Sequence, residues 1–164
     1  MTSVRSLTAG YDPDAEVDLH GFAGSLAMYA AAVAATVLVG RATNQTLPHR
    51  YDPADLAIGA LATHKAARLL SKASVASPLR APFTEFAGPA GAGEHHEEAR
   101  GDQGVRHVVG ELMTCPFCLG VWIGSAYVAG LVLAPRPTRA LGAVMTVVAG
   151  SDFAQHLYQR LRGD

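Results

Sequence analysis

Two cysteines three positions apart, Cys115 and Cys118, are the residues of this sequence most suited to chemistry. Pro116 directly follows the first cysteine, and proline is favoured in the first turn of a helix, where its missing N–H has no partner to lose. Both sulfurs would then lie in a first helical turn, whose unpaired amides and positive dipole end favour a thiolate over a thiol. One interpretation of this spacing is therefore a redox pair in which Cys115 attacks and Cys118 resolves the mixed disulfide.

The same pair fits two other interpretations. Two thiolates at this spacing supply half of a tetrahedral zinc site, and His107 is the nearest candidate for a further ligand. A single pair is weak support for zinc, whereas a second pair would make the prediction strong. Alternatively, Cys115 and Cys118 are small apolar residues that pack at the start of a helix. Residue types and spacing leave all three interpretations open.

Four ionisable side chains interrupt apolar stretches elsewhere in the chain. They are His64, Arg68, Asp152 and His156. Charged side chains within apolar helices tend to pair, so we expect a contact of Asp152 with Arg68 or His64 that has a structural role and holds two helices together. A polar pocket or proton path is the alternative, but no further ionisable residues continue a path through either helix. We therefore predict an intramembrane polar cluster.

The elements that must position these residues are apolar segments, which we expect as helices over about 22–40, 54–72, 115–134 and 139–159. Apolar segments of about 20 residues are typical of membrane-spanning helices. Only 16% of the residues are charged, against about 25% in a typical soluble domain. The predicted fold is an all-α integral membrane bundle of three or four transmembrane helices, with the second segment as the least certain span. A soluble helical domain that buries these segments is the alternative.

The remaining stretches are polar. Residues 1–20 are expected as an acidic tail and residues 21–164 as a single membrane domain, with one long polar loop over residues 73–111. The glycine-rich part of this loop should be mobile, and the loop offers a contact surface for a protein partner. Lys and Arg are more frequent beside the termini and the long loop, which predicts that this side is cytoplasmic. A net charge of −1 without a basic stripe argues against nucleic acid as a partner.

Five short motifs point to a family. They are ATHKAARLL, SPLRAPFTEF, ARG near residue 100, GELMTCPFCLGVW and AGSDF near residue 150. Together they resemble a bacterial family of small membrane proteins catalogued as domain of unknown function thirteen-sixty, which has a sporulation-associated member in bacilli. The resemblance extends over residues 50–160 and implies an integral protein of the bacterial cell membrane. It implies no particular reaction and supplies no catalytic residues.

Two classes of function follow from these observations. The first is a non-enzymatic membrane protein with a structural, assembly or partner-binding role, in which the thiol pair packs or binds a metal. The second is a membrane thiol-disulfide oxidoreductase that uses Cys115 as attacking thiol and Cys118 as resolver. The lipid bilayer is the expected surrounding of the helices in both classes. A homo-oligomer is compatible with either, and zinc is the one cofactor that the residues suggest.

Overall fold

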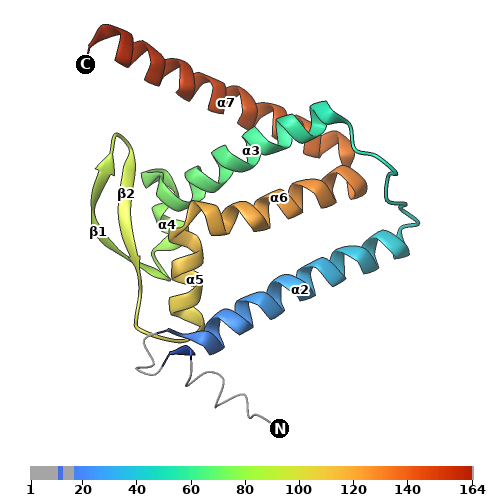
Figure 1. Cartoon of the computed structure of the whole chain (residues 1–164), viewed down its shortest axis with the longest axis horizontal. Coiled ribbons are helices and arrows are strands. Elements are labelled where there is room, and N and C mark those ends of the chain that lie inside the picture. Colours follow the sequence, from blue (N-terminus) through green and yellow to red (C-terminus); the bar gives the residue numbers. More distant parts are fainter. Residues whose placement is uncertain (1–10, 13–16, 164) are drawn as a thin grey trace.

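A computed structural model of the chain describes residues 11–12 and 17–163. Its long helices are α2 (Leu19–Ala42), α3 (Pro53–Lys72), α6 (Pro116–Leu133) and α7 (Pro135–Arg162). Between α3 and α6 lie η1 (Ser74–Ala76), α4 (Ser77–Arg80), β1 (Thr84–Gly91), β2 (Glu94–Ala99) and α5 (Val105–Thr114). We call the four long helices the stem and residues 73–114 the head, which lies at one end of the stem (Figure 1).

Each stem helix begins at a residue that caps a helix or at a proline that is tolerated in the first helical turn. Asp18 accepts the backbone N–H of Gly21 at the start of α2, and Asp52 accepts that of Ala54 at the start of α3. Prolines occupy the first turn of α3, α6 and α7. Four helices therefore lie where the sequence predicts them, and the largest difference is at α7, which begins at Pro135.

Helices α3, α6 and α7 pack against one another around the ring of Tyr127 on α6. A side chain at Gly59 on α3 or Gly142 on α7 would collide with this ring, so the two glycines allow the helices to approach. The Tyr127 hydroxyl donates to the carbonyl oxygen of Asp55 at 3.1 Å. The carboxylate of Asp55 accepts from the guanidinium of Arg139 at 2.7 and 2.9 Å, which joins α3 to α7.

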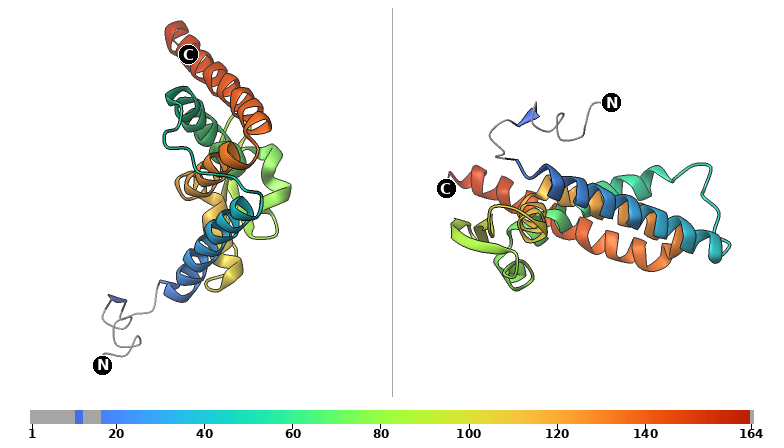
Figure 2. Two further views of the ribbon diagram at one scale, coloured as in Figure 1. Left: turned by 90° about the vertical axis from the view of Figure 1, so that its right-hand side faces the viewer. Right: turned by 90° about the horizontal axis from the view of Figure 1, so that it is seen from below.

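Helix α2 lies outside the group formed by α3, α6 and α7 and contacts that group through α6, while its start contacts α5 (Figures 1 and 2). None of its residues is buried, and the same holds for α6. In the described part of the chain, α2 and α6 are the two helices that are long and apolar enough to cross a membrane. By length and composition, the described residues therefore contain two candidate membrane spans.

The head contains an antiparallel hairpin of β1 and β2, in which Thr84 lies opposite Ala99. Its turn uses Gly93 with a φ of 73°, a backbone conformation that glycine adopts without strain. The pairing shifts register beside Gly88 and again before Gly91, so the strands are irregular. The glycines of this stretch thus serve a specific hairpin.

A buried ion pair between Arg80 of α4 and Glu97 of β2 lies at the centre of the head. Arg80 is completely buried and donates to the two carboxylate oxygens of Glu97 at 2.7 and 2.8 Å. Its other N–H groups donate to the carbonyl oxygens of Leu70 and Ala73 and to the hydroxyl of Ser77. The hydrogen bonds from Arg80 lower the pKa of Glu97 to about 2 despite its burial. The pair therefore joins the end of α3, α4 and the hairpin.

The predicted fold class is wrong in two respects. The protein is not all-α, because residues 73–111, predicted as one long polar loop with a mobile glycine-rich part, include the hairpin and the first half of α5. The described part of the chain has two candidate spans and not three or four. Helices α3 and α7 are too polar for a span, and they pair charged residues such as Lys65 and Asp152 with each other.

Candidate functional site

Helices α5 and α6 meet at Cys115, and the sequence explains the break between them. Cys115 has the extended backbone angles φ −101° and ψ 105°, because the residue before a proline is disfavoured in the helical region. Pro116 then begins α6, where an N–H would have no helical partner. Cys115 is consequently the N-cap of α6 and lies where the head meets a candidate span.

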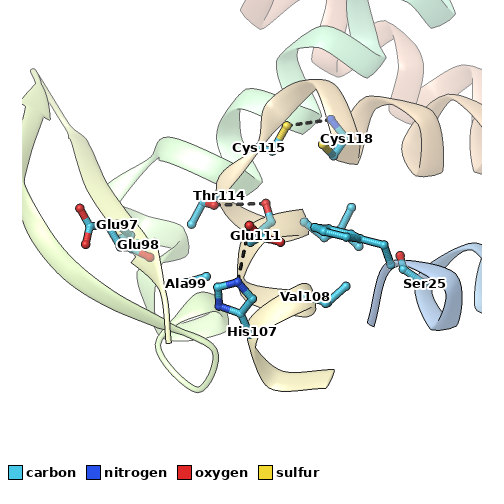
Figure 3. A pocket seen from close by; sticks show the side chains of 12 residues that line it. Ser25, Glu97, Glu98, Ala99, His107, Val108, Glu111, Thr114, Cys115 and Cys118 are labelled. Atoms are coloured by element: carbon cyan, nitrogen blue, oxygen red, sulfur yellow. Dashed lines mark hydrogen bonds and ion pairs between the residues drawn. The ribbon is translucent and has the colours of Figure 1, made fainter. Parts of the chain in front are cut away.

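The two sulfurs lie in the first turn of α6 (Figure 3). Cys115 Sγ accepts the backbone N–H of Cys118 at 3.2 Å. Both thiols are free, with Cys115 half-buried and Cys118 exposed. Burial raises the pKa of the Cys115 thiol, but hydrogen bonds from the Cys118 thiol and from the amides of Cys118 and Phe117 together lower it below its ordinary value. Cys115 is therefore favoured as a thiolate nucleophile.

Both cysteines line an open pocket of about 690 Å³ between the head and the start of α2. Figure 3 shows that its other polar residues come from three elements. They are Glu97 and Glu98 from β2, His107, Glu111 and Thr114 from α5, and Ser25 from α2. The pocket thus brings two thiols together with carboxylate and imidazole groups, which can accept and donate protons.

Helix α5 forms one wall of this pocket and is fixed on two sides. Asp18, at the start of α2, accepts the backbone N–H of Gly104 at 2.6 Å, directly before α5 begins. On the other side Gly110 faces the head, where a Cβ would lie 2.5 Å from the carbonyl oxygen of Phe83 and 3.0 Å from Ala99. Only glycine allows this close approach. The wall is therefore held between α2 and the hairpin.

His107 and Glu111 lie one turn apart on α5, with 3.6 Å between Nε2 and Oε1. Their other polar atoms, Nδ1 and Oε2, are enclosed without a hydrogen-bond partner among the described residues. His107 precedes Cys115 by eight residues, about two turns of α5, which separates the two positions by roughly 12 Å along the helix axis. The predicted zinc ligands Cys115, Cys118 and His107 are thus not brought together. The described part of the chain contains no group of three or more His, Cys, Asp or Glu side chains that could bind a metal ion.

The residues predicted as a polar cluster make separate contacts. Asp152 of α7 pairs with Lys65 of α3, a residue that the prediction did not include. Arg68 turns toward the head instead and donates two hydrogen bonds to Glu94 of β2, each 2.8 Å long. The stem and the head are therefore joined by Arg68, while Asp152 joins two helices of the stem.

The two histidines of that prediction lie on the surface of the stem. His64 stacks on the ring of Phe153, with 6.3 Å between the ring centroids and 17° between the planes. His156 is exposed six residues before the end of α7. Asp152, Arg68 and His64 thus make three separate contacts, none of which involves His156, and the four residues do not gather around one pocket.

Sequence reasoning missed the buried pair of Arg80 and Glu97, which positions β2 against the thiol pocket. The signal was present as an arginine after Ser77-Pro78 and a run of acidic residues in an otherwise small and apolar stretch. A charge pattern does not state which charges are buried, so it could not single out this pair. His95 extends the network through a 2.9 Å contact between its Nδ1 and the hydroxyl of Ser77.

A comparison with known proteins adds one finding. The sequence model of a family described as Protein of unknown function (DUF1360) matches residues 58–158. The match includes the head, the whole of α6 and both cysteines, but not α2. No curated protein and no solved structure matches the chain.

Proposed function

We propose that this chain, which belongs to the family described as Protein of unknown function (DUF1360), exchanges disulfides at a membrane surface through Cys115 and Cys118. The proposal places α2 and α6 in the cytoplasmic membrane, with the head and the thiol pair on its cytoplasmic side. The observation that supports it most is the hydrogen bond from the Cys118 amide to Cys115 Sγ beside an open pocket.

A purely packing role of the two cysteines fits the geometry less well. Packing residues are enclosed by other side chains, whereas Cys118 is exposed and Cys115 is half-buried. The N-cap position also gives Cys115 a hydrogen bond that stabilises a thiolate, and an apolar packing residue gains nothing from such a bond. Exposure and hydrogen bonding together favour reactivity over packing.

The proposed exchange has two steps. The Cys115 thiolate attacks a disulfide of a partner protein, forms a mixed disulfide and releases one partner thiolate. Cys118 then loses its proton and attacks the Cys115 sulfur, which forms the Cys115–Cys118 disulfide and releases the second partner thiolate. The partner gains two electrons and the cysteine pair loses them. In this proposal Glu111, which lines the same pocket, accepts the proton of Cys118.

A second candidate function is a non-enzymatic assembly role, in which the head binds a protein partner without exchanging disulfides. The buried ion pair of Arg80 and Glu97 favours this candidate, because it fixes the shape of the head over residues 73–114. A fixed polar surface beside a membrane is suited to binding. The partner would contact the same region in both functions, so the state of the cysteines distinguishes them.

Thiol trapping across controlled redox potentials tests the proposal. The protein in lipid nanodiscs is equilibrated in glutathione buffers from about −320 to −180 mV, and free thiols are then alkylated with a maleimide of high mass. The expected result is a reversible Cys115–Cys118 disulfide with a midpoint in this range. Absence of that disulfide at every potential would leave the non-enzymatic role in its place.

Two matched variants identify the roles of the sulfurs. Cys118→Ser should accumulate a mixed disulfide with a small aromatic disulfide, whereas Cys115→Ser should not. The opposite assignment would contradict the proposed order of attack. Metal analysis of the same samples tests the zinc interpretation, which requires bound zinc that is lost in Cys118→Ser.

A further inference from the structure

An apolar groove of about 760 Å³ runs between the candidate spans α2 and α6. It is separate from the thiol pocket, with which it shares no lining residue. Most of its wall is aliphatic, and the main contributors are Val33, Val37, Val128, Ala129, Val132 and Leu133. Neither helix has a buried residue, so the groove between them is open to the surroundings of the protein and is not covered by another part of the described chain.

Aromatic rings close the groove at the end nearer the head. Tyr29 of α2 and Trp122 of α6 meet edge to face, with 5.2 Å between the ring centroids. The hydroxyl groups of Tyr29 and Ser125 lie 2.7 Å apart, which satisfies these polar atoms with each other. This end of the groove therefore offers an apolar surface to an occupant.

The opposite end of the groove carries a positive charge. Arg41 lies in the last turn of α2 and lines the groove there, together with Gln45 and Tyr51. The guanidinium of Arg41 is exposed and forms no ion pair within the described residues. An apolar channel that ends at an unpaired cation complements an amphipathic anion.

The length of the groove fits one leaflet of a membrane. From Tyr29 to Arg41 the helix rises roughly 18 Å. Half of a hydrocarbon core is about 15 Å thick. An occupant that reaches from the cation to the aromatic rings would therefore extend from the membrane surface to the bilayer centre, which is the span of one acyl chain.

We propose that the groove between α2 and α6 binds a phospholipid with an anionic head group. One acyl chain lies along the aliphatic wall and ends at Tyr29 and Trp122, and the phosphate pairs with Arg41. The site is independent of the disulfide exchange proposed above, because the groove shares no lining residue with the thiol pocket and none of its lining residues contains sulfur.

Trp122 is the sole tryptophan of the chain and lines the groove, so its fluorescence reports the occupant. The protein is placed in mixed vesicles of phosphatidylglycerol and phosphatidylcholine. One of the two lipids at a time carries bromine in the half of its acyl chains that is farther from the head group. We expect quenching by brominated phosphatidylglycerol to correspond to a roughly fivefold enrichment of this lipid at the groove over the surrounding bilayer. Fivefold corresponds to about 1 kcal/mol, the attraction between one cationic side chain and anionic lipid.

Two arginine variants separate the groove from general attraction to the vesicle. Arg41→Gln should abolish the preference, and Arg41→Lys should keep it. Arg50→Gln removes the same charge from the exposed segment before α3, outside the groove, and should leave the preference unchanged. Equal quenching by both lipids, or a preference that survives in Arg41→Gln, would overturn the proposal. Quenching below that of bulk lipid, relieved when the protein is diluted with lipid, would overturn it in favour of a second copy of the chain.

Discussion

In the head, the completely buried guanidinium of Arg80 donates hydrogen bonds to the Glu97 carboxylate, the Ser77 hydroxyl and two carbonyl oxygens, whereas α2 and α6 have no buried residue at all. The head thus has a polar centre, and the two candidate spans present aliphatic side chains to their surroundings. This difference between the head and the spans is expected if water surrounds the head and lipid surrounds the spans. A domain in water needs its buried charges paired, and an apolar helix without protein cover needs lipid around it.

The boundary between these regions is where the thiols lie. Cys115 ends the head and caps α6, and its sulfur accepts a hydrogen bond from the first turn of that helix. A reactive sulfur there can meet protein partners from the water while its helix stays in lipid. The following changes test the contrast between head and spans, from the largest expected effect to the smallest.

Removing Arg80 should have the largest effect. Arg80→Ala leaves the carboxylate of Glu97 buried without its partner, and such a loss costs about 3–5 kcal/mol of stability. Hydrogen exchange of the hairpin amides in nanodiscs measures it. The control is Arg68→Ala, which breaks an exposed ion pair to the same hairpin and should cost less than about 1 kcal/mol. Equal effects of the two variants would contradict a head organised around a buried pair.

Acid should weaken the head before it affects the spans. The pKa of Glu97 is about 2 in the folded protein and 4.5 without the fold, so its contribution to stability is complete above pH 4.5. That contribution, roughly 3 kcal/mol, is lost as the pH falls from 4.5 toward 2. Hydrogen exchange of the hairpin at several pH values should show this slope in the natural protein and not in Glu97→Gln. The same slope in both would show that another group titrates.

A new charge should be costly in a candidate span and neutral on the surface of the head. Ala31 lies at the middle of α2 and is exposed, and Ala31→Arg should disfavour membrane insertion by about 2.5–3 kcal/mol. Val75→Arg places the same charge on an exposed position of the head and should be neutral. The fraction of protein that resists carbonate extraction gives the comparison. If Ala31→Arg is as well retained as Val75→Arg, lipid is not the surrounding of α2.

The smallest effect concerns the link between the regions. Asp18 accepts one N–H from α2 and another from Gly104 before α5, whereas Asp52 accepts one N–H at the start of α3. Each substitution by alanine should cost about 1 kcal/mol. Hydrogen exchange should reveal opening at both α2 and α5 in Asp18→Ala, and opening only at α3 in Asp52→Ala. Opening confined to α2 in Asp18→Ala would show that the bond to Gly104 does not hold the pocket wall.

The long helices could be predicted from the sequence because their signals are local. Uncharged stretches and nearby prolines mark them, and Pro116 in particular fixes Cys115 as a cap through a one-residue steric effect. The number of spans could not be predicted in the same way. Whether Lys65 is compensated depends on Asp152, which lies far away in the sequence. The sequence shows that α3 and α7 carry charged residues, but it does not show that Lys65 and Asp152 pair with each other between the two helices.

The head could not be predicted because its order depends on contacts between distant residues. A glycine-rich stretch is flexible when it is isolated, whereas here Arg80 and Arg68 hold the hairpin through ion pairs with Glu97 and Glu94 of β2. The zinc interpretation illustrates the same difficulty. His107 is close to Cys115 in the sequence, but the straight course of α5 keeps them apart.

The pH dependence of Cys115 alkylation tests the central claim most directly. The Cys118→Ser variant in lipid nanodiscs leaves a single thiol, keeps the amide that donates to Cys115 Sγ, and has a hydroxyl donor in place of the Cys118 thiol. It is treated with a charged, membrane-impermeant iodoacetamide. We predict reaction without detergent, with a half-maximal rate at a pH below the ordinary pKa of a cysteine thiol. A midpoint at or above that value, or no reaction until detergent is added, would contradict a thiolate poised where the head meets the membrane.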